Sequence, residues 1–388
     1  MEIGMRLYQL AIPTKIYFGR DIWKEALNAQ EMIVQGNVMV VTTGRSLIRL
    51  GYLEQLEIQI KENFNVNKVI LFDTVSANPR LSEVKEGIVV GRQEKINVIV
   101  GFGGGSSLDA AKAIAAGIPE KVNIEALFYQ GKEPGKYTLP IIAIPTTAGT
   151  GSELSKAAII TDEQQRIKKG IRGTVLYPQA AIVDSIFTES VPFSVTMETG
   201  FDVLAHGMES YLSKAASPFT KMQSEYAIQI VGKYLPRLSN NLQDIEAREK
   251  MSYASMIMGI NLGNASTCLP HRLQYPLGAY TGTSHGAGLA ALFPAWIGCE
   301  YRHVYEDIER MMELLTGNCI HGKDACIEKI RKFIQKIQLP VSLSQLGVGE
   351  KAFLDIFEKG VTGNIGNDPA VGKNDRNIIR ELYQAAWE

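Results

Sequence analysis

Short apolar runs alternate with longer amphipathic stretches through the first half of the chain. Runs that are rich in β-branched residues and bounded by glycine, asparagine or proline predict buried strands at residues 37–42, 68–72, 97–101 and 139–144. Helical periodicity predicts helices over residues 46–55, 80–92 and 106–116. This alternation is typical of a parallel, doubly wound sheet with right-handed crossovers.

From about residue 193 the pattern changes to long helical periods with few strand-like runs. The predicted helices cover residues 197–213, 220–235, 247–262 and 300–315. A length of 388 residues also exceeds one ordinary core, which favours two domains. We expect an α/β domain over residues 1–188 and an all-α domain over residues 189–388, with the boundary near residues 186–192.

The composition narrows the class of protein. A net charge of −1 with 21% charged residues gives no reason to expect a nucleic-acid partner. No apolar run reaches the roughly 18 residues that a membrane span needs, and the N-terminus does not read as a signal peptide. The four cysteines have no zinc-ribbon spacing and are typical of unpaired thiols. We therefore expect a cytoplasmic globular protein that binds neither nucleic acid nor membrane.

A glycine-rich loop follows the third predicted strand. Gly103, Gly104 and Gly105 lead into an alanine-rich helix, and Ser106 stands where it could cap that helix. Such glycines let the backbone approach a phosphate, and the helix N-terminus offers unpaired N–H groups to an anion. The loop has neither the ending of a P-loop nor the GxGxxG spacing, so a tight turn without a ligand is the alternative.

A second loop, PTTAGTGSE at residues 145–153, follows the fourth predicted strand. It would lie at the same carboxyl edge of the sheet, where open α/β sheets bind their ligands. Its hydroxyls and glycines could bond the phosphates and ribose of a nucleotide, whereas the alternative is an ordinary capped turn. Two such loops at one edge favour a dinucleotide.

A carboxylate and three imidazoles mark a candidate metal site. Asp202 and His206 are four residues apart in a predicted helix, so both lie on one face and can reach one cation. His271 and His285 follow in the next segments, and these three are among only five histidines in the chain. This donor set suits an ion of intermediate softness, such as Fe(II) or Zn(II).

With these motifs in this order, the chain resembles the iron-containing alcohol dehydrogenase family (group III) over nearly its whole length. The resemblance implies a dinucleotide-binding α/β domain and a helical domain, the architecture shared with dehydroquinate synthase, with a metal in the cleft between them. It matches Asp202, His206, His271 and His285 to the ligands of Fe²⁺, with Zn²⁺ possible. Homo-oligomers, dimers among them, are usual in the family.

The same resemblance implies the cofactor contacts. They are Gly103, Gly104, Gly105, Ser106 and Asp109 at the pyrophosphate, Thr146, Thr147 and Thr150 at the nicotinamide half, and Lys168 at the ribose, with Lys169 as its rival.

Cofactor choice is a separate question. NAD-preferring relatives often carry an aspartate after the second strand, but residues 41–46 contain no carboxylate. Thr43 is the candidate cofactor contact of this segment, and Arg45 could pair with a 2′-phosphate or be a solvated surface residue. The sequence therefore permits NAD(H) or NADP(H).

Two residues depart from the family pattern. Tyr275 stands where relatives typically have a second histidine, and a tyrosine hydroxyl is the weaker proton donor at neutral pH. Beside it, Arg272 replaces a residue that is often small or apolar. A guanidinium in a desolvated cleft is a forked partner for a sulfonate, phosphonate or carboxylate, and a structural ion pair is an equal alternative. We therefore take Tyr275 and Arg272 as candidate catalytic residues.

The resemblance predicts a metal-dependent, NAD(P)H-linked reductase of a small aldehyde that also oxidises the alcohol. The substrate could be anionic, such as sulfoacetaldehyde or phosphonoacetaldehyde, or neutral, as in a general primary-alcohol or lactaldehyde dehydrogenase. A dehydroquinate-synthase-like lyase is the alternative from another class, and stoichiometric consumption of NAD(P)H would separate the two. A non-catalytic metal-binding protein is a weaker alternative, because both loops and all four matched ligands are intact.

Overall fold

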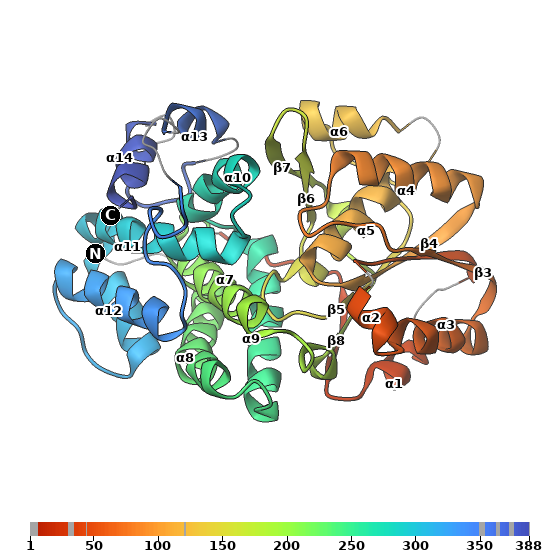
Figure 1. Ribbon diagram of the computed structural model, residues 1–388, viewed down its shortest axis with the longest axis horizontal. Helices are drawn as coiled ribbons and strands as arrows, with labels where there is room; N and C mark the ends of the chain where they lie inside the picture. The colour runs from red at the N-terminus through yellow and green to blue at the C-terminus, as the bar shows by residue number, and fades with distance from the viewer. Residues whose placement is uncertain are drawn as a thin grey trace.

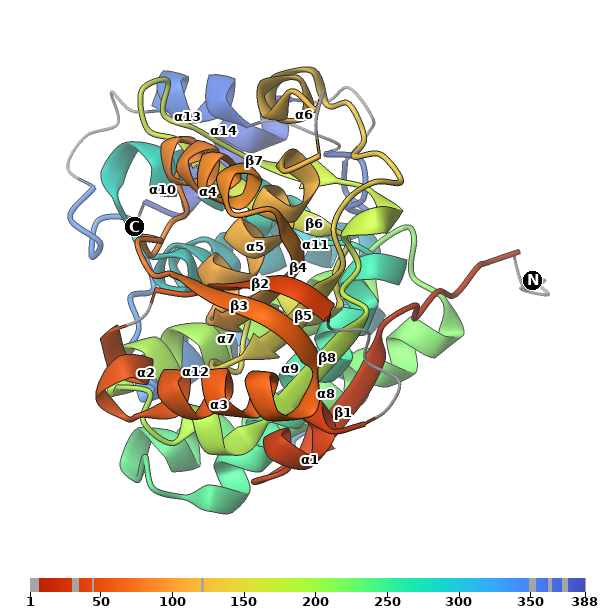
Figure 2. The ribbon, with the colours of Figure 1, turned by 90° about the vertical axis from the view of Figure 1, so that its right-hand side faces the viewer.

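The computed structural model describes residues 7–29, 35–43, 45–119, 122–348, 354–361, 365–371 and 376–387. Its first half contains a six-stranded parallel sheet in the order β1-β8-β5-β4-β2-β3, with helices on both faces (Figures 1 and 2). The strands are β1 Lys15–Gly19, β2 Gln35–Val41, β3 Asn65–Phe72, β4 Ile96–Gly103, β5 Ile141–Pro145 and β8 Ala180–Asp184. The helices are α1 Trp23–Leu27, α2 Arg45–Arg49, α3 Tyr52–Asn63, α4 Leu81–Gln93, α5 Gly105–Gly117 and α6 Ile124–Gln130.

Alternating side chains of the sheet build two separate cores. In β2, Val38 and Val40 pack with α1 and α3 on one face, whereas Met39 and Val41 pack with α4 and α5 on the other. This follows from the period of two along a strand, which sends neighbouring residues to opposite faces. Because both faces are covered, the central strands β5 and β8 are buried along their whole length, and this confirms the predicted α/β class.

The predicted strands occur as β2 to β5, but the helix expected over residues 46–55 is wrong. Two helices, α2 and α3, occupy this stretch and meet at Gly51, whose φ of 74° is left-handed and incompatible with a continuous helix. The helical period of the apolar residues continues across this glycine, so periodicity alone does not reveal the break.

An antiparallel hairpin was not predicted. It consists of β6 Ala157–Asp162 and β7 Ile167–Arg172, paired outside the main sheet. Short 3₁₀ helices at Ser152–Leu154 and Thr174–Leu176 flank it, and a third at Ser185–Thr188 follows β8. In Figure 1 the hairpin stands at the side of the sheet that faces the helical half, and β7 contacts α10. The hairpin therefore forms one wall between the two halves.

The described residues of the second half contain helices and connecting loops but no strand (Figure 1). Its helices are α7 Phe193–Leu212, α8 Pro218–Asn240, α9 Ile245–Asn264, α10 Leu269–Thr281, α11 His285–Thr316, α12 Lys323–Lys336, α13 Leu354–Gly360 and α14 Asn377–Ala385. The helix expected at residues 300–315 is the second part of α11, which is kinked at Val304. A boundary between residues 188 and 189 stays a prediction.

Buried aromatic rings hold the helical half together. Phe201 of α7 meets Phe293 of α11 edge to face at 5.3 Å, and Phe293 contacts Trp296 at 4.9 Å. All three side chains are fully buried in the largest apolar cluster. This packing fixes α7, which carries Asp202 and His206, against the helix that begins with His285. Among the described helices, none is both long and apolar enough to span a bilayer.

Candidate metal centre and cofactor loops

The two loops predicted to bind a nucleotide meet at the carboxyl ends of adjacent strands. Gly103 at the end of β4 pairs with Pro145 at the end of β5, and the Thr146 amide donates to the Gly103 carbonyl at 3.0 Å. A methyl group on Gly105 would lie 2.7 Å from Thr150 Oγ1, so the loops approach too closely there for any larger residue. Parallel pairing thus brings together segments that are 40 residues apart in the sequence.

Thr43 reaches the same edge from β2. Its amide donates to Ser107 Oγ at 3.0 Å, which places the segment after β2 against the first turn of α5. Arg45, the first residue of α2, is exposed. The loop after β2 and the two glycine- and threonine-rich loops therefore border one edge of the sheet.

The expected capping role of Ser106 is wrong. Helix α5 begins at Gly105 with Gly104 as its N-cap and without a side-chain cap, while the Ser106 hydroxyl donates to the Ala77 carbonyl. Since Ser106 already lies inside the first turn, its side chain points away from the free amides of that turn. Those amides are consequently not blocked by a serine side chain.

Asp109 is held by protein partners. Its carboxylate accepts from Ser152 Oγ at 2.5 Å and from the Ile159 amide at 3.0 Å, and Lys112 Nζ lies 3.9 Å away. Burial raises the pKa of Asp109, and Lys112 and these hydrogen bonds oppose that rise. Asp109 thus ties the glycine-rich helix to the second loop and to the hairpin, and a direct contact with a pyrophosphate stays a prediction.

The alternation along β7 separates Lys168 from its rival Lys169. Lys168 Nζ donates to Asn78 Oδ1 at 2.9 Å and lies 5.9 Å from the centre of the Tyr275 ring. Lys169 Nζ donates instead to the Tyr129 carbonyl, on the other side of the strand. Burial lowers the pKa of Lys168 to about 8, against the opposing effect of nearby carboxylates. Of the two lysines, Lys168 is the one turned toward the predicted site.

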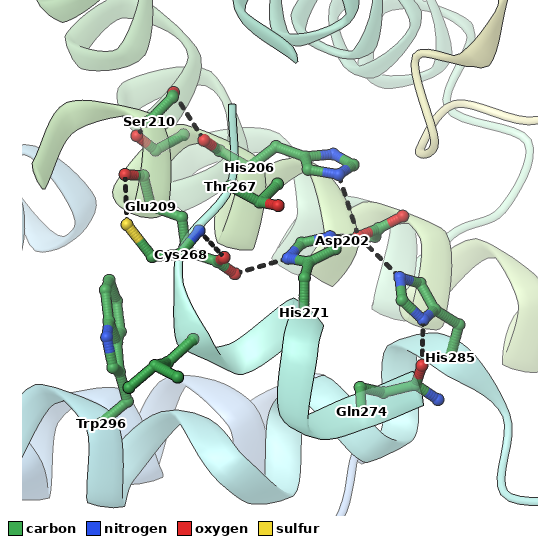
Figure 3. A network of polar contacts seen from close by, with 12 residues as sticks. Asp202, His206, Glu209, Ser210, Thr267, Cys268, His271, Gln274, His285 and Trp296 are labelled. Carbon is green, nitrogen blue, oxygen red and sulfur yellow. Dashed lines mark hydrogen bonds and ion pairs between the residues drawn. The ribbon is translucent and has the colours of Figure 1, made fainter. Parts of the chain in front are cut away.

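The three predicted histidine ligands converge on one carboxylate oxygen of the fourth predicted ligand, Asp202 (Figure 3). Asp202 Oδ1 lies 3.6 Å from His206 Nε2, 3.3 Å from His271 Nε2 and 3.7 Å from His285 Nε2. The ligand atoms of Asp202, His271 and His285 all lie within 4.8 Å of one another. Three helices, α7, α10 and α11, supply these side chains, so the site exists only in the folded helical half.

A second layer of residues orients two of the imidazoles. His271 Nδ1 is 2.6 Å from Glu209 Oε1, and His285 Nδ1 is 2.5 Å from Gln274 Oε1 (Figure 3). When a carboxylate or amide oxygen accepts the Nδ1 proton of a neutral imidazole, the Nε2 atom is the one left free to hold a metal ion. Glu209 and Gln274 were missed from the sequence, although both spacings were visible: Glu209 is two helical turns after Asp202, and Gln274 is three residues after His271.

The charges around the site attract a cation. Burial pushes the pKa of Asp202 upward, but the three imidazoles outweigh it and hold that pKa below its usual range. Burial lowers the pKa of His206 and of His285. It would do the same for His271, but the Glu209 and Asp202 carboxylates raise the pKa of His271 to about 10. The buried carboxylates of Asp202 and Glu209 thus face the imidazoles, and His206 and His285 favour the neutral form that binds a metal ion.

Buried atoms without hydrogen-bond partners also indicate that Asp202 and His271 could hold a divalent ion, whatever the family resemblance implies. Asp202 Oδ1 and His271 Nε2 are buried and lack a hydrogen-bond partner, although they are only 3.3 Å apart. Two buried polar atoms that approach without a hydrogen bond are costly unless something between them satisfies both. One carboxylate with imidazoles matches Fe(II) or Zn(II).

Tyr275 and Arg272 lie next to this cluster. The Tyr275 ring is nearly parallel to that of His285, with centroids 6.3 Å apart, and Arg272 Cζ lies 5.9 Å from the Tyr275 ring centre. Arg272 is 7% exposed, its Nε has no hydrogen-bond partner, and it takes part in none of the salt bridges found in the described ranges. No carboxylate of the described residues lies within salt-bridge distance of Arg272, and the Asp368 carboxylate acts on it only at longer range.

Comparison with known proteins places the chain in a family. The family model for "Iron-containing alcohol dehydrogenase" matches residues 13–185, and that for "Fe-containing alcohol dehydrogenase family, C-terminal" matches residues 196–387. Choline dehydrogenase of Bacillus subtilis is 33% identical over 395 residues, which cover 99% of this chain and 95% of the relative. NAD-dependent methanol dehydrogenase of Bacillus methanolicus is 30% identical over 346 residues, which cover 88% of this chain and 90% of the relative.

A solved structure extends this similarity to the whole fold. Sulfoacetaldehyde reductase from Bifidobacterium kashiwanohense, in complex with NAD⁺, has a TM-score of 0.86 at 28% identity and covers 99% of both chains. The sheet, the loops and the histidine cluster described above agree with these similarities, and the family uses iron and NAD(H) as cofactors. The chain belongs to the iron-containing alcohol dehydrogenase family and is an NAD-dependent alcohol or aldehyde dehydrogenase.

Proposed function

We propose that this dehydrogenase reduces a short aldehyde that carries a sulfonate or phosphonate group, and that it oxidises the corresponding alcohol in reverse. The observation that carries the proposal is Arg272, a buried guanidinium without an ion-pair partner in the described part of the chain, directly after His271. A buried cation is costly to leave unpaired, so an anion supplied by the substrate would satisfy it. Arg272 Cζ lies 5.9 Å from the centre of the Tyr275 ring, and that ring lies 6.3 Å from the ring of His285, which favours a short substrate.

Each part of the site has a role in this reaction. Asp202, His206, His271 and His285 would hold the divalent ion. When bound, that ion would act as a Lewis acid on the carbonyl group and the reduced nicotinamide would supply hydride. The Tyr275 hydroxyl, beside the ring of His285, is our candidate for the proton donor.

The charge around Tyr275 also argues against a cationic substrate. Lys168 Nζ and Arg272 Cζ each lie 5.9 Å from the centre of its ring. A quaternary ammonium group, such as that of the choline named in one relative, is usually bound by aromatic faces free to accept it. Here the protein's own cations occupy that position, which favours an anionic ethanol derivative over choline.

We propose that the protein accepts NADP(H) as well as NAD(H). The segment after β2 carries no carboxylate that would repel a 2′-phosphate, and Arg45 is exposed beside it. Fe(II) is the proposed ion. Zn(II) could replace it in purified protein because it binds such ligands more tightly.

Substitution of Arg272 tests the proposal. Arg272→Ala is expected to raise KM for sulfoacetaldehyde by about 30- to 1,000-fold, because removing one partner of a buried charged pair costs roughly 2–4 kcal/mol. KM for propanal should change little, and Arg272→Lys should restore part of the loss by keeping the charge. Steady-state kinetics with both aldehydes measures this, and equal losses for the two would refute an anion-binding role.

We also propose a cytoplasmic homodimer. The arm at residues 7–12 exposes Leu7, Leu10 and Ile12, and it leads into β1, an edge strand of the sheet. Exposed apolar side chains beside an open strand edge favour pairing with a second copy. The four cysteines are unpaired thiols, which suits a reducing compartment. Light scattering should give the mass of two chains, whereas the mass of one chain would contradict the dimer.

A further inference from the structure

A second guanidinium, that of Arg172, reaches the same tyrosine from the other half of the molecule. Arg172 ends β7, the hairpin strand that contacts α10. Residues two apart in a strand share a face, so Arg172 lies on the face that turns Lys168 toward Tyr275. No motif points to Arg172 in the sequence, because it is one arginine in a polar stretch.

The side chain of Arg172 folds back along the strand. A methyl group on Gly170 would lie 3.3 Å from Arg172 Nε and 3.4 Å from its Cζ, so the guanidinium crosses directly over this glycine. This places the guanidinium on the Lys168 side of the strand, where Tyr275 and Arg272 both affect its charge. Gly170 thus leaves the space that directs Arg172 into the region between the two halves.

The charge balance around Arg172 is positive. Arg172 is exposed to solvent. The protein atoms packed around it nevertheless lower the pKa of Arg172; Tyr275 opposes that shift and Arg272 adds to it. Asp109 is the acid that acts on Arg172, and its oxygens are already bonded to Ser152 and Ile159. Like Arg272, Arg172 takes part in none of the salt bridges of the described residues.

We propose that Arg172 and Arg272 are the two arms of a clamp for the acid group of the substrate, one arm from each half of the molecule. Three side chains, Lys168, Arg172 and Arg272, bring positive charge to one tyrosine beside the candidate metal centre. Two forked guanidiniums need an acceptor with several oxygens, which a sulfonate or phosphonate provides. The clamp rests on the proposed function, and it adds that a bound anion connects β7 to α10.

The clamp predicts which ligands depend on Arg172. The protein loaded with Fe(II) and NADH cannot oxidise an alcohol, so alcohol binding can be measured by calorimetry without turnover. The ligands are 2-hydroxyethanesulfonate, 2-hydroxyethylphosphonate, choline and 1-propanol. Arg172→Gln is expected to weaken binding of the two anions by about 10- to 100-fold, which corresponds to a lost charged hydrogen bond. Binding of 1-propanol should stay unchanged.

A matched control lies in the same hairpin. Arg166 is exposed, as Arg172 is, and stacks over Tyr280, also in α10, with its Cζ 5.6 Å from the ring centre, but it lies outside the candidate site. Arg166→Gln should leave all four affinities unchanged. Arg172→Lys should recover part of the anion binding, because an ammonium keeps the charge but loses the fork.

The outcomes separate the clamp from the proposed function. If the unaltered protein prefers the anions over choline and 1-propanol but Arg172→Gln binds them equally well, the clamp is wrong and Arg272 acts alone. Equal losses for anions and 1-propanol would also overturn the clamp, because they indicate a structural role for Arg172. If the unaltered protein does not prefer anions, the proposed function itself fails.

Discussion

Replacing Asp202 with asparagine is expected to abolish stoichiometric metal binding and, with it, NADH oxidation. Asp202 Oδ1 is the one atom that faces all three imidazoles, at 3.3 to 3.7 Å. Asparagine keeps the shape but removes the charge, so the loss in metal affinity should exceed the roughly 100-fold limit typical of residues outside the ligand shell. Elemental analysis after dialysis against Fe(II), and then against buffer, measures the bound metal.

A matched substitution controls for the loss of one carboxylate. Asp307 forms a salt bridge with Lys221 at 3.1 Å on the surface of the helical half. Asp307→Asn should bind one equivalent of metal and keep full activity. Circular dichroism should show both variants folded, and one equivalent of tightly bound metal in Asp202→Asn would contradict the assignment of this ligand.

Replacing Glu209 with glutamine should weaken metal binding and also destabilise the fold. Glu209 is fully buried, its Oε1 accepts from His271 Nδ1 at 2.6 Å, and its Oε2 accepts from the Cys268 amide at 2.7 Å. Glutamine has one acceptor oxygen for these two donors. If the oxygen accepts from one donor, the NH₂ group faces the other and cannot accept its proton. We expect a 10- to 100-fold loss of metal affinity, as for other residues that orient a ligand.

The same substitution should also destabilise the protein without metal. One buried donor is left unpaired, which costs about 1–3 kcal/mol. Chelator competition measures the metal affinity, and denaturant unfolding of metal-free protein measures the stability. An unchanged affinity for Fe(II) would show that Glu209 does not orient His271.

The sequence predicts the parts of this protein that depend on local patterns. Strands β2 to β5 are apolar and bounded by turn residues, so they were found. Asp202 and His206 share a helix face and were paired from their spacing. The break at Gly51 was missed because a single left-handed residue does not alter the apolar period around it.

The parts that depend on long-range contacts could not be predicted. The two arginines come from segments 100 residues apart, and only the packing of β7 on α10 brings them to one tyrosine. In the second loop, a methyl group on Gly151 would lie 2.5 Å from Gly259 Cα, so this glycine permits contact with α9. The sequence alone suggested a role for the glycines of that loop at a nucleotide.

The most direct test of the account is the rate of NADH and NADPH oxidation by Fe(II)-reconstituted protein, with sulfoacetaldehyde, phosphonoacetaldehyde, propanal and lactaldehyde compared side by side. We expect kcat/KM for at least one anionic aldehyde to exceed that for both neutral ones by about tenfold or more, the effect of one charged hydrogen bond. Equal or higher values for propanal and lactaldehyde would contradict it and leave a general alcohol dehydrogenase.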